Sequence, residues 1–442
     1  MNRLTSQTRK LIYLILIVCL LVPITLLGMP SSSESGSGGK LSKLRTEHRL
    51  GESSLGQVDP ASSTMNLLLL GLRGVATNLL WMEADKQKDT KNWAQLRTTV
   101  DSIILLQPHY PKVWIYQGWN LAYNVSVEWD AVADRYFWVK EGIKFLIKGS
   151  ARNEDHPELL WHTGNFFGQK VGRADEWKQF RTYFINDPEP RLNGGVDPEL
   201  NPEIKDNYLV AKGYFLQANE AEEKNKDLQH IMADILFRHY PVRAQFDYPA
   251  ALQREGTFGE TTVEAWRIGY EEWTQIYGQE TYDSPGGKVK LEATDDDIKL
   301  LAQQDNVTEL VKREWVDRYQ KMTNYVYWRS ISQIERTEKM MQAHREMYLG
   351  KQAFKESRNT EAKSLLESGM AKYAEIMSQN PDMQVEENAI EEGLMAVLLW
   401  QHLYEIDGIA IPENYPLKPL WDQHQSRVPY LTNDFRREFG IQ

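Results

Sequence analysis

Apolar residues recur at helical spacing along most of the chain after residue 64. One such face includes Leu310, Met322 and Val326, within residues 301–349, a stretch that contains no proline and no glycine. Apolar residues that repeat every three or four positions form one stripe of an α-helix. Only residues 288–292, beside the turn-rich "YDSPGG", have the character of a short strand. The pattern therefore predicts an all-α body, with one very long helix or two abutting helices over residues 301–349.

A stretch without charged residues occupies residues 11–29, "LIYLILIVCLLVPITLLGM". A helix of this length spans roughly 28 Å, about the thickness of a hydrocarbon core. Arg3, Arg9 and Lys10 precede it, and the positive-inside rule then places the N-terminus in the cytoplasm. The sequence predicts a single-pass anchor in the inner (cytoplasmic) membrane, with the body on the periplasmic side. A cleaved signal peptide is the alternative.

A second apolar stretch, residues 65–82, could return the body to the cytoplasm as another membrane span. Arg73 would then lie near the bilayer centre, at a cost of about 2.5–3.5 kcal/mol. We therefore prefer a buried first helix of the body. Residues 31–63 begin with the Ser/Gly-rich "SSSESGSGG", which predicts a flexible linker between the anchor and the body.

The charge balance of the body excludes several kinds of partner. The net charge is −11, and because Arg3, Arg9 and Lys10 contribute +3, the rest of the chain carries −14. An acidic body disfavours nucleic acid, whose phosphates need clustered Lys and Arg. The only cysteine, Cys19, lies in the first apolar stretch, so disulfides and cysteine-ligated metals are excluded for the body.

Motifs for catalysis are absent from the sequence. There is no HExxH, GxSxG, P-loop or GxGxxG. The Asp residues after Thr294 suit the first turn of a capped helix better than a calcium loop. His156 and His162 are six residues apart, which puts them on different helix faces. Glu367 in "LESGM" resembles the Glu-Ser of helical-superhelix lytic transglycosylases and carries the enzymatic alternative. We predict no catalytic site, no metal and no cofactor.

The aromatic stretch "LLQPHYPKVWIYQGWNLAY" belongs to an internal repeat. Ala84 and Gly118 are 34 residues apart, and Gly164 follows in a third, similar unit. "PKVWIYQG" and "PELLWHTG" share the same spacing from proline to glycine. A small residue lets two helices of a pair approach closely, and a proline ends the pair. Similar hairpins are predicted around Gly213 and around Gly350, and a longer second helix over residues 131–147.

These offsets resemble the tetratricopeptide repeat (TPR), a 34-residue helix–turn–helix unit. The resemblance implies a TPR-like α-solenoid of stacked helical hairpins after the N-terminal transmembrane helix, similar to membrane-anchored repeat proteins of bacterial envelopes. It also implies a groove for a protein or peptide partner. The family's groove positions, transferred residue by residue, are Asn78, Trp81, Asp85, Lys112, Trp119, Tyr123, Trp161 and Asn165.

The predicted organisation has five parts. They are a cytoplasmic tip and transmembrane anchor (1–30), a flexible linker (31–63), TPR-like repeats (64–250), a second helical block with long helices and a further TPR-like hairpin (251–410), and a Pro-rich C-terminal tail (411–442). The expected function is a membrane-anchored scaffold that binds or assembles envelope proteins without catalysis. The alternatives are an envelope enzyme, or enzyme subunit, that acts on cell-wall or surface glycan, and a self-assembling structural envelope component.

Overall fold

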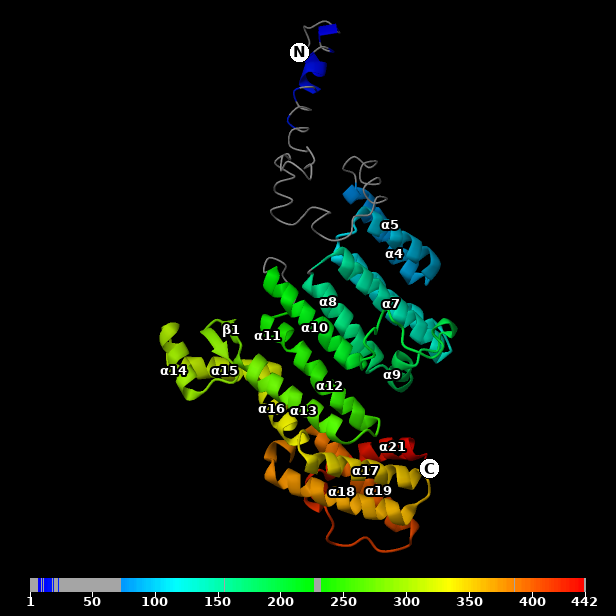
Figure 1. Cartoon of the computed structure of the whole chain (residues 1–442), viewed down its shortest axis with the longest axis vertical. Coiled ribbons are helices and arrows are strands. Elements are labelled where there is room, and N and C mark those ends of the chain that lie inside the picture. The colour runs from blue at the N-terminus through cyan, green and yellow to red at the C-terminus, as the bar shows by residue number, and fades with distance from the viewer. Residues whose placement is uncertain are drawn as a thin grey trace.

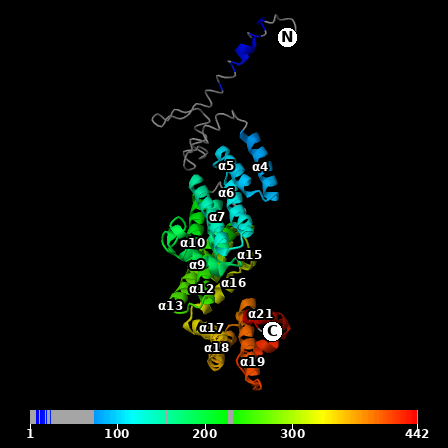
Figure 2. The ribbon, with the colours of Figure 1, turned by 90° about the vertical axis from the view of Figure 1, so that its right-hand side faces the viewer.

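The computed structural model describes residues 73–154, 156–225, 232–384 and 386–440, together with residues 7–8, 10, 12–17, 19 and 23. Within them lie eighteen α-helices and a single two-stranded sheet, which confirms the predicted all-α class. Helices α4 and α5 lie at one end of an elongated arrangement, and α17 to α21 lie at the other (Figures 1 and 2).

The N-terminal half of this body consists of short helices that pack side by side. Its elements are α4 (Arg73–Asp89), α5 (Trp93–Leu106), α6 (Pro111–Trp119), the π-helical segment η2 (Asn120–Val125), η3 (Ser126–Glu128), α7 (Val132–Arg152), α8 (Pro157–Asn165), the π-helical segment η4 (Phe166–Val171), α9 (Trp177–Ile185), η5 (Pro190–Leu192), α10 (Asn207–Lys224), α11 (Asp234–Arg238), α12 (Tyr240–Arg254) and α13 (Glu260–Glu271). The helix predicted over residues 131–147 is α7. Prolines occupy the first position of α6 and α8, where the missing N–H costs nothing.

Glycines set the distance between α6 and α7. A Cβ atom on Gly118 would lie 2.8 Å from Leu146 Cγ, and one on Gly142 would lie 2.6 Å from the Gly118 carbonyl oxygen. The prediction that Gly118 marks a close helix contact is confirmed. Gly164 differs, because its neighbours are Ala211 and Phe215 of α10 and not residues of α9.

The predicted hairpin around Gly213 has a different basis from the one expected. A Cβ atom on Gly213 would meet nothing within 4 Å, so this glycine is not a packing position. Ala211, two residues earlier, is fully buried and faces Gly164. Pro241 does not end a helix but stands in the first turn of α12.

A side lobe follows α13 and projects from the main arrangement in Figure 1. It contains η6 (Glu272–Ile276), η7 (Tyr277–Gln279), β1 (Thr281–Ser284), β2 (Gly287–Lys290), α14 (Asp295–Gln304) and α15 (Glu309–Thr323), and α16 (Tyr325–Glu335) leads back. The strands pair antiparallel, with Ser284 opposite Gly287. Thr294 caps the start of α14, as the sequence predicted, and together with Asp297 it forms a reciprocal capping box.

The prediction of one very long helix or two abutting helices over residues 301–349 is wrong. The stretch contains the end of α14, all of α15 and α16, and most of α17 (Glu338–Lys355). Asn306 and Asn324 adopt φ of 52°, a left-handed conformation that stops a helix. The side chains of Thr308 and Thr337 then cap α15 and α17.

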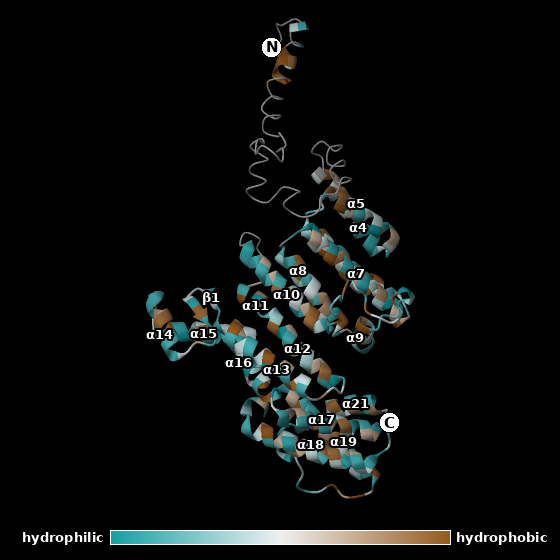
Figure 3. Ribbon diagram, in the orientation of Figure 1, coloured by the Kyte–Doolittle hydropathy of each residue, from teal (hydrophilic) through white to brown (hydrophobic). Residues whose placement is uncertain are grey.

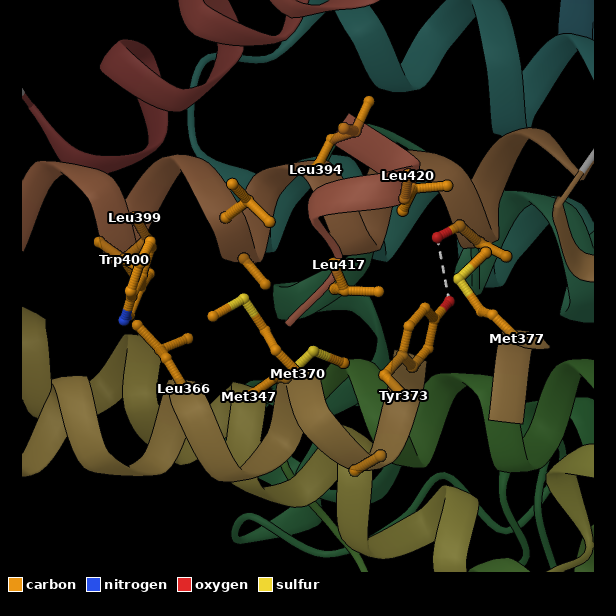
Figure 4. Close-up of a cluster of buried hydrophobic side chains, with 14 of the residues drawn as sticks. Met347, Leu366, Met370, Tyr373, Met377, Leu394, Leu399, Trp400, Leu417 and Leu420 are labelled. Carbon is orange, nitrogen blue, oxygen red and sulfur yellow. Dashed lines mark hydrogen bonds between the residues drawn. The ribbon is translucent and has the colours of Figure 1, made fainter. Parts of the chain in front are cut away.

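The C-terminal bundle has its own apolar core. It contains α17, α18 (Asn359–Gln379), η8 (Pro381–Gln384), α19 (Glu387–Ile406), α20 (Lys418–Gln423), η9 (Gln425–Arg427) and α21 (Val428–Phe439). Gly350 of α17 meets Leu366 and Ala362 of α18, the pair of positions that the repeat pattern indicated. Figure 4 shows Leu417 and Leu420 beside the core residues of α18 and α19. Residues 411–442, expected as a Pro-rich tail, thus contribute two helices, α20 and α21.

The prediction of a single-pass inner-membrane protein with a periplasmic body is contradicted. No helix among the described residues is long and apolar enough to cross a membrane. In Figure 3, none of the labelled helices is apolar along its whole length, because polar residues alternate with apolar ones. The linker 31–63, residues 65–72 of the second apolar stretch and much of residues 11–29 lie outside the described residues.

Candidate functional site

An aromatic strip crosses α4, α6 and η2. We define it by Trp81, Tyr116, Trp119 and Tyr123. Trp81 meets Tyr116 edge to face with ring centroids 5.1 Å apart, and Trp119 stacks on Tyr123 at 5.8 Å. The Lys88 Nζ atom lies 5.8 Å from the Tyr116 ring and 5.9 Å from the Trp119 ring, so one ammonium group bridges the two pairs. The four rings and this cation form one continuous surface.

The local sequence explains why the strip is continuous. Tyr116, Trp119 and Tyr123 are spaced three and four residues apart, so they share one helix face. The chain passes from α6 into η2 without a break, and the wider π-helical turn carries Tyr123. Trp119 is 41% exposed, and burial raises the pKa of the half-buried Tyr123. The strip therefore offers both accessible and partly sheltered aromatic faces.

Lys170 extends the strip to the next helical pair. Its Nζ atom lies 4.7 Å from the Tyr123 ring, and the Phe166 ring meets Tyr123 edge to face at 5.5 Å. Burial lowers the pKa of Lys170 from its ordinary value. Since Lys170 and Phe166 belong to η4, the two π-helical segments are in contact through Tyr123.

A carboxylate completes the chemistry of the strip. The Tyr116 hydroxyl donates to Asp85 Oδ1 at 3.5 Å. Burial, followed by the charge of Asp85, raises the pKa of Tyr116 to about 12. The surface can thus contact apolar, cationic and anionic groups of a ligand, and the raised pKa keeps the Tyr116 hydroxyl protonated at pH 7.

The structure divides the eight predicted groove residues into separate places. Trp81, Asp85, Trp119 and Tyr123 come together on or beside the strip. Asn78 is exposed on α4, one turn before Trp81. The first four of these residues lie on one surface.

The remaining three predicted residues lie elsewhere. Lys112 forms an ion pair with Glu158 at 2.5 Å, between the starts of α6 and α8. Trp161 packs edge to face on Tyr240 of α12 at 5.0 Å. Asn165 lines a cavity of about 220 Å³ whose walls come from η4, α10 and α12. The cavity is a second candidate site beside the strip.

Sequence reasoning missed Tyr116, Lys88 and Lys170 as members of the strip. Tyr116 could have been found, because it lies three residues before Trp119 on the same helix face. Lys88 is seven residues after Trp81, again on one face. Lys170 had no such signal, because its approach to Tyr123 depends on how two helical pairs pack.

A buried histidine links the central helices to the C-terminal bundle. His344 Nδ1 lies 2.7 Å from Glu392 Oε1, and its Nε2 lies 3.0 Å from Glu335 Oε1. Gln253 of α12 donates to the other Glu335 oxygen at 3.0 Å. Burial alone would lower the pKa of His344, but the two carboxylates outweigh it and raise the pKa well above its ordinary value. Both ring nitrogens of His344 are hydrogen-bonded to carboxylates, so a charged imidazolium can hold α16 and α19 together at this point.

The candidate residues His156, His162 and Glu367 lie in surroundings that indicate a packing role. Burial lowers the pKa of His156, and that of His162 to about 4. Glu367 accepts hydrogen bonds from the Trp400 indole at 2.9 Å and the Tyr404 hydroxyl at 3.1 Å. No group of three His, Cys, Asp or Glu residues suited to a metal ion is present in the described part of the chain.

Comparison with protein-family models, with curated proteins and with solved structures finds no match for this chain.

Proposed function

We propose that the chain is a TPR-like helical scaffold that binds an extended segment of a protein partner along the aromatic strip, without catalysis of its own. The observation that carries this proposal is the continuity of the strip from Trp81 to Tyr123 and on to Lys170. A continuous surface over successive helical pairs suits a ligand that is itself extended.

The repeat interpretation is supported by two matching helices. The α6–η2 and α8–η4 segments each have nine α-helical and six π-helical residues. They begin 46 residues apart, at Pro111 and Pro157, which is twelve more than the 34-residue TPR period, and each has its glycine at the eighth position. A small residue packs closely against another helix in both segments, at Gly118 and Gly164.

The chemistry of the strip favours a protein segment with both apolar and charged side chains. Trp and Tyr are enriched where proteins bind one another, because their rings bury a large area at low cost in conformational entropy. Lys88 can form ion pairs with acidic side chains of the partner, whereas the exposed Asp85 can form them with basic ones. Lys170 is only 9% exposed and instead contacts the Tyr123 ring. A phosphate-rich ligand fits less well, because the chain has a net charge of −11.

The glycan-enzyme alternative depends on Glu367, and its surroundings favour packing. Both of its hydrogen-bond donors, Trp400 and Tyr404, belong to α19 of the C-terminal bundle. A general acid or base needs a substrate within hydrogen-bond reach. The non-enzymatic proposal is therefore the better supported one.

Position-specific photo-crosslinking tests the proposal. A photoreactive phenylalanine analogue replaces Trp119 in the full chain, and in a matched control it replaces Tyr430, an aromatic residue of α21 that is 77% exposed. We expect a defined protein adduct from position 119 and not from position 430. For the captured partner, Trp119→Ala is expected to weaken binding roughly tenfold or more, as for a central interface tryptophan. Identical adducts from both positions, or none from 119, would contradict the proposal.

A further inference from the structure

The cavity beside η4, α10 and α12 holds a guanidinium group with no acidic partner of its own. The Arg243 Cζ atom lies 3.5 Å from the centre of the Trp328 ring. Asp247, one turn later on α12, is hydrogen-bonded to Arg173. Among the residues that the structure describes, no hydrogen bond or ion pair joins Arg243 to an acceptor. Its five N–H donors are therefore available to a ligand.

The position of Arg243 is unfavourable for its charge. Burial lowers the pKa of Arg243 to about 10, although Asp247 acts in the opposite direction, and Arg173 adds to the lowering. A partly buried cation without a hydrogen-bonded carboxylate costs free energy, which a bound anion would offset. Such a cost is typical of a site that is completed by its ligand.

A second unsatisfied group borders the same cavity. The His239 Nδ1 atom is buried and has no hydrogen-bond partner within the described residues. Burial, and then the charge of Arg243, lower the pKa of His239 to about 3, so the imidazole is neutral at pH 7. A neutral imidazole can still donate one N–H. Asn165 and Gln169 also line the cavity and add amide donors.

The charge balance of the cavity selects a monoanion. Arg173 and Asp247 neutralise one another, and His239 carries no charge, which leaves the single positive charge of Arg243. A planar carboxylate matches the two parallel donors of a guanidinium, and it carries one negative charge. A phosphate group has a larger charge and would have to be offset by a second cation.

We propose that this cavity binds a carboxylate group of the partner segment, with Arg243 as its main donor and with His239 and Asn165 as further donors. The inference rests on the proposed function, because it names a chemical group that the partner would present. The carboxylate can come from an acidic side chain or from the C-terminus of a chain. A volume of about 220 Å³ suits one such side chain and not a folded domain.

Small probes test this site in the full chain. N-acetylglycine presents a terminal carboxylate, N-acetylglutamic acid amide presents a side-chain carboxylate, and N-acetylglutamine amide is the uncharged match. Inorganic phosphate is the fourth probe. Binding of each is followed by saturation-transfer NMR of the ligand, which detects weak complexes. We expect at least one carboxylate probe to bind, and the probe that binds more tightly identifies the source of the carboxylate.

Substitutions then assign the binding to Arg243. Arg243→Gln is expected to weaken carboxylate binding at least tenfold. Arg336→Gln is the matched control, because Arg336 is also half-buried and lies 4.0 Å from the Tyr270 ring; it should bind as the unaltered chain does. Because Arg243 has no acidic partner, Arg243→Gln should lower the thermal unfolding temperature only slightly, through the loss of its stacking on Trp328. If that variant fails to fold, Asn165→Ala, which keeps the guanidinium, should still weaken binding about threefold or more.

The inference is overturned if neither carboxylate probe binds, if phosphate or the glutamine probe binds as tightly, or if Arg243→Gln binds normally. Failure of this site and failure of the scaffold are distinguishable. If a partner is still captured from position 119 while no carboxylate probe binds, only the proposed carboxylate site is wrong. If a carboxylate probe binds but no adduct forms at position 119, the proposal that the aromatic strip binds the partner is wrong.

Discussion

Replacing Lys140 by alanine is expected to lower the free energy of unfolding by about 3–5 kcal/mol, because it leaves a buried carboxylate without its cation. The Lys140 Nζ atom lies 2.7 Å from Asp187 Oδ2 and 2.9 Å from Glu189 Oε2, and it is 3.6 Å from Asp197 Oδ2. The Lys140 and Asp187 side chains are only 2% and 1% exposed. In the alanine variant Asp197 still has a second cation, because Lys144 Nζ lies 2.8 Å from its Oδ2 atom. Asp187 is therefore the carboxylate that is left buried without a cation.

Denaturant unfolding of the full chain followed by far-UV circular dichroism measures this loss. Arg267→Ala is the control, because Arg267 pairs with Glu264 and Glu271 on the exposed surface of α13. Exposed ion pairs contribute little, so this variant should unfold close to the unaltered chain. Equal stability of the Lys140 and Arg267 variants would show that the buried cluster does not hold residues 186–206 against α7.

Gly142→Leu is expected to destabilise the fold by about 3 kcal/mol, whereas Gly213→Ala should stabilise it by up to about 1 kcal/mol. Both glycines lie inside helices, α7 and α10. A Cβ atom on Gly142 would lie 2.6 Å from the Gly118 carbonyl oxygen, which belongs to the backbone and cannot rotate away. A Cβ atom on Gly213 meets nothing within 4 Å, so only the helix propensity changes.

Thermal unfolding of the two variants checks that the two substitutions change the stability in opposite directions. The Gly142 variant should also change the near-UV signal of the neighbouring aromatic residues, since α6 carries Tyr116 and Trp119. A Gly142→Leu chain as stable as the Gly213→Ala chain would contradict the close contact of α6 and α7.

Local signals in the sequence were sufficient for individual helices. Thr294 and the Asp residues after it predicted the start of α14, because a hydroxyl can cap a helix and carboxylates suit its first turn. Gly350 with Ala362 and Leu366 predicted the α17–α18 contact, because only a small residue allows that approach. These predictions depend on residues close in sequence.

The breaks within residues 301–349 were missed for a physical reason. Apolar spacing reports which face a helix buries, but it does not report where a helix ends. Asn306 and Asn324 end α14 and α15 by adopting positive φ, which asparagine tolerates better than other residues with a side chain. Thr308 and Thr337 could have been recognised as caps.

The candidate site was predictable only within one helix. Trp119 and Tyr123 share a face of α6–η2 because they are four residues apart. Trp81 of α4 joins them only through its packing on Tyr116, which spacing does not predict. Trp161 and Asn165 separated from them, because Gly164 packs on α10 and the short α9 does not take its expected place. Arg243 had no sequence signal, since its lack of an acidic partner depends on Asp247 pairing with Arg173.

Hydrogen–deuterium exchange of the full chain, alone and with the partner captured from position 119, tests the central claim most directly. The account predicts slower exchange in α4 (Arg73–Asp89) and in Pro111–Val125 when the partner is bound, with α18 (Asn359–Gln379) unchanged. Protection confined to the C-terminal bundle, or none in Pro111–Val125, would contradict the claim that the aromatic strip is the binding surface.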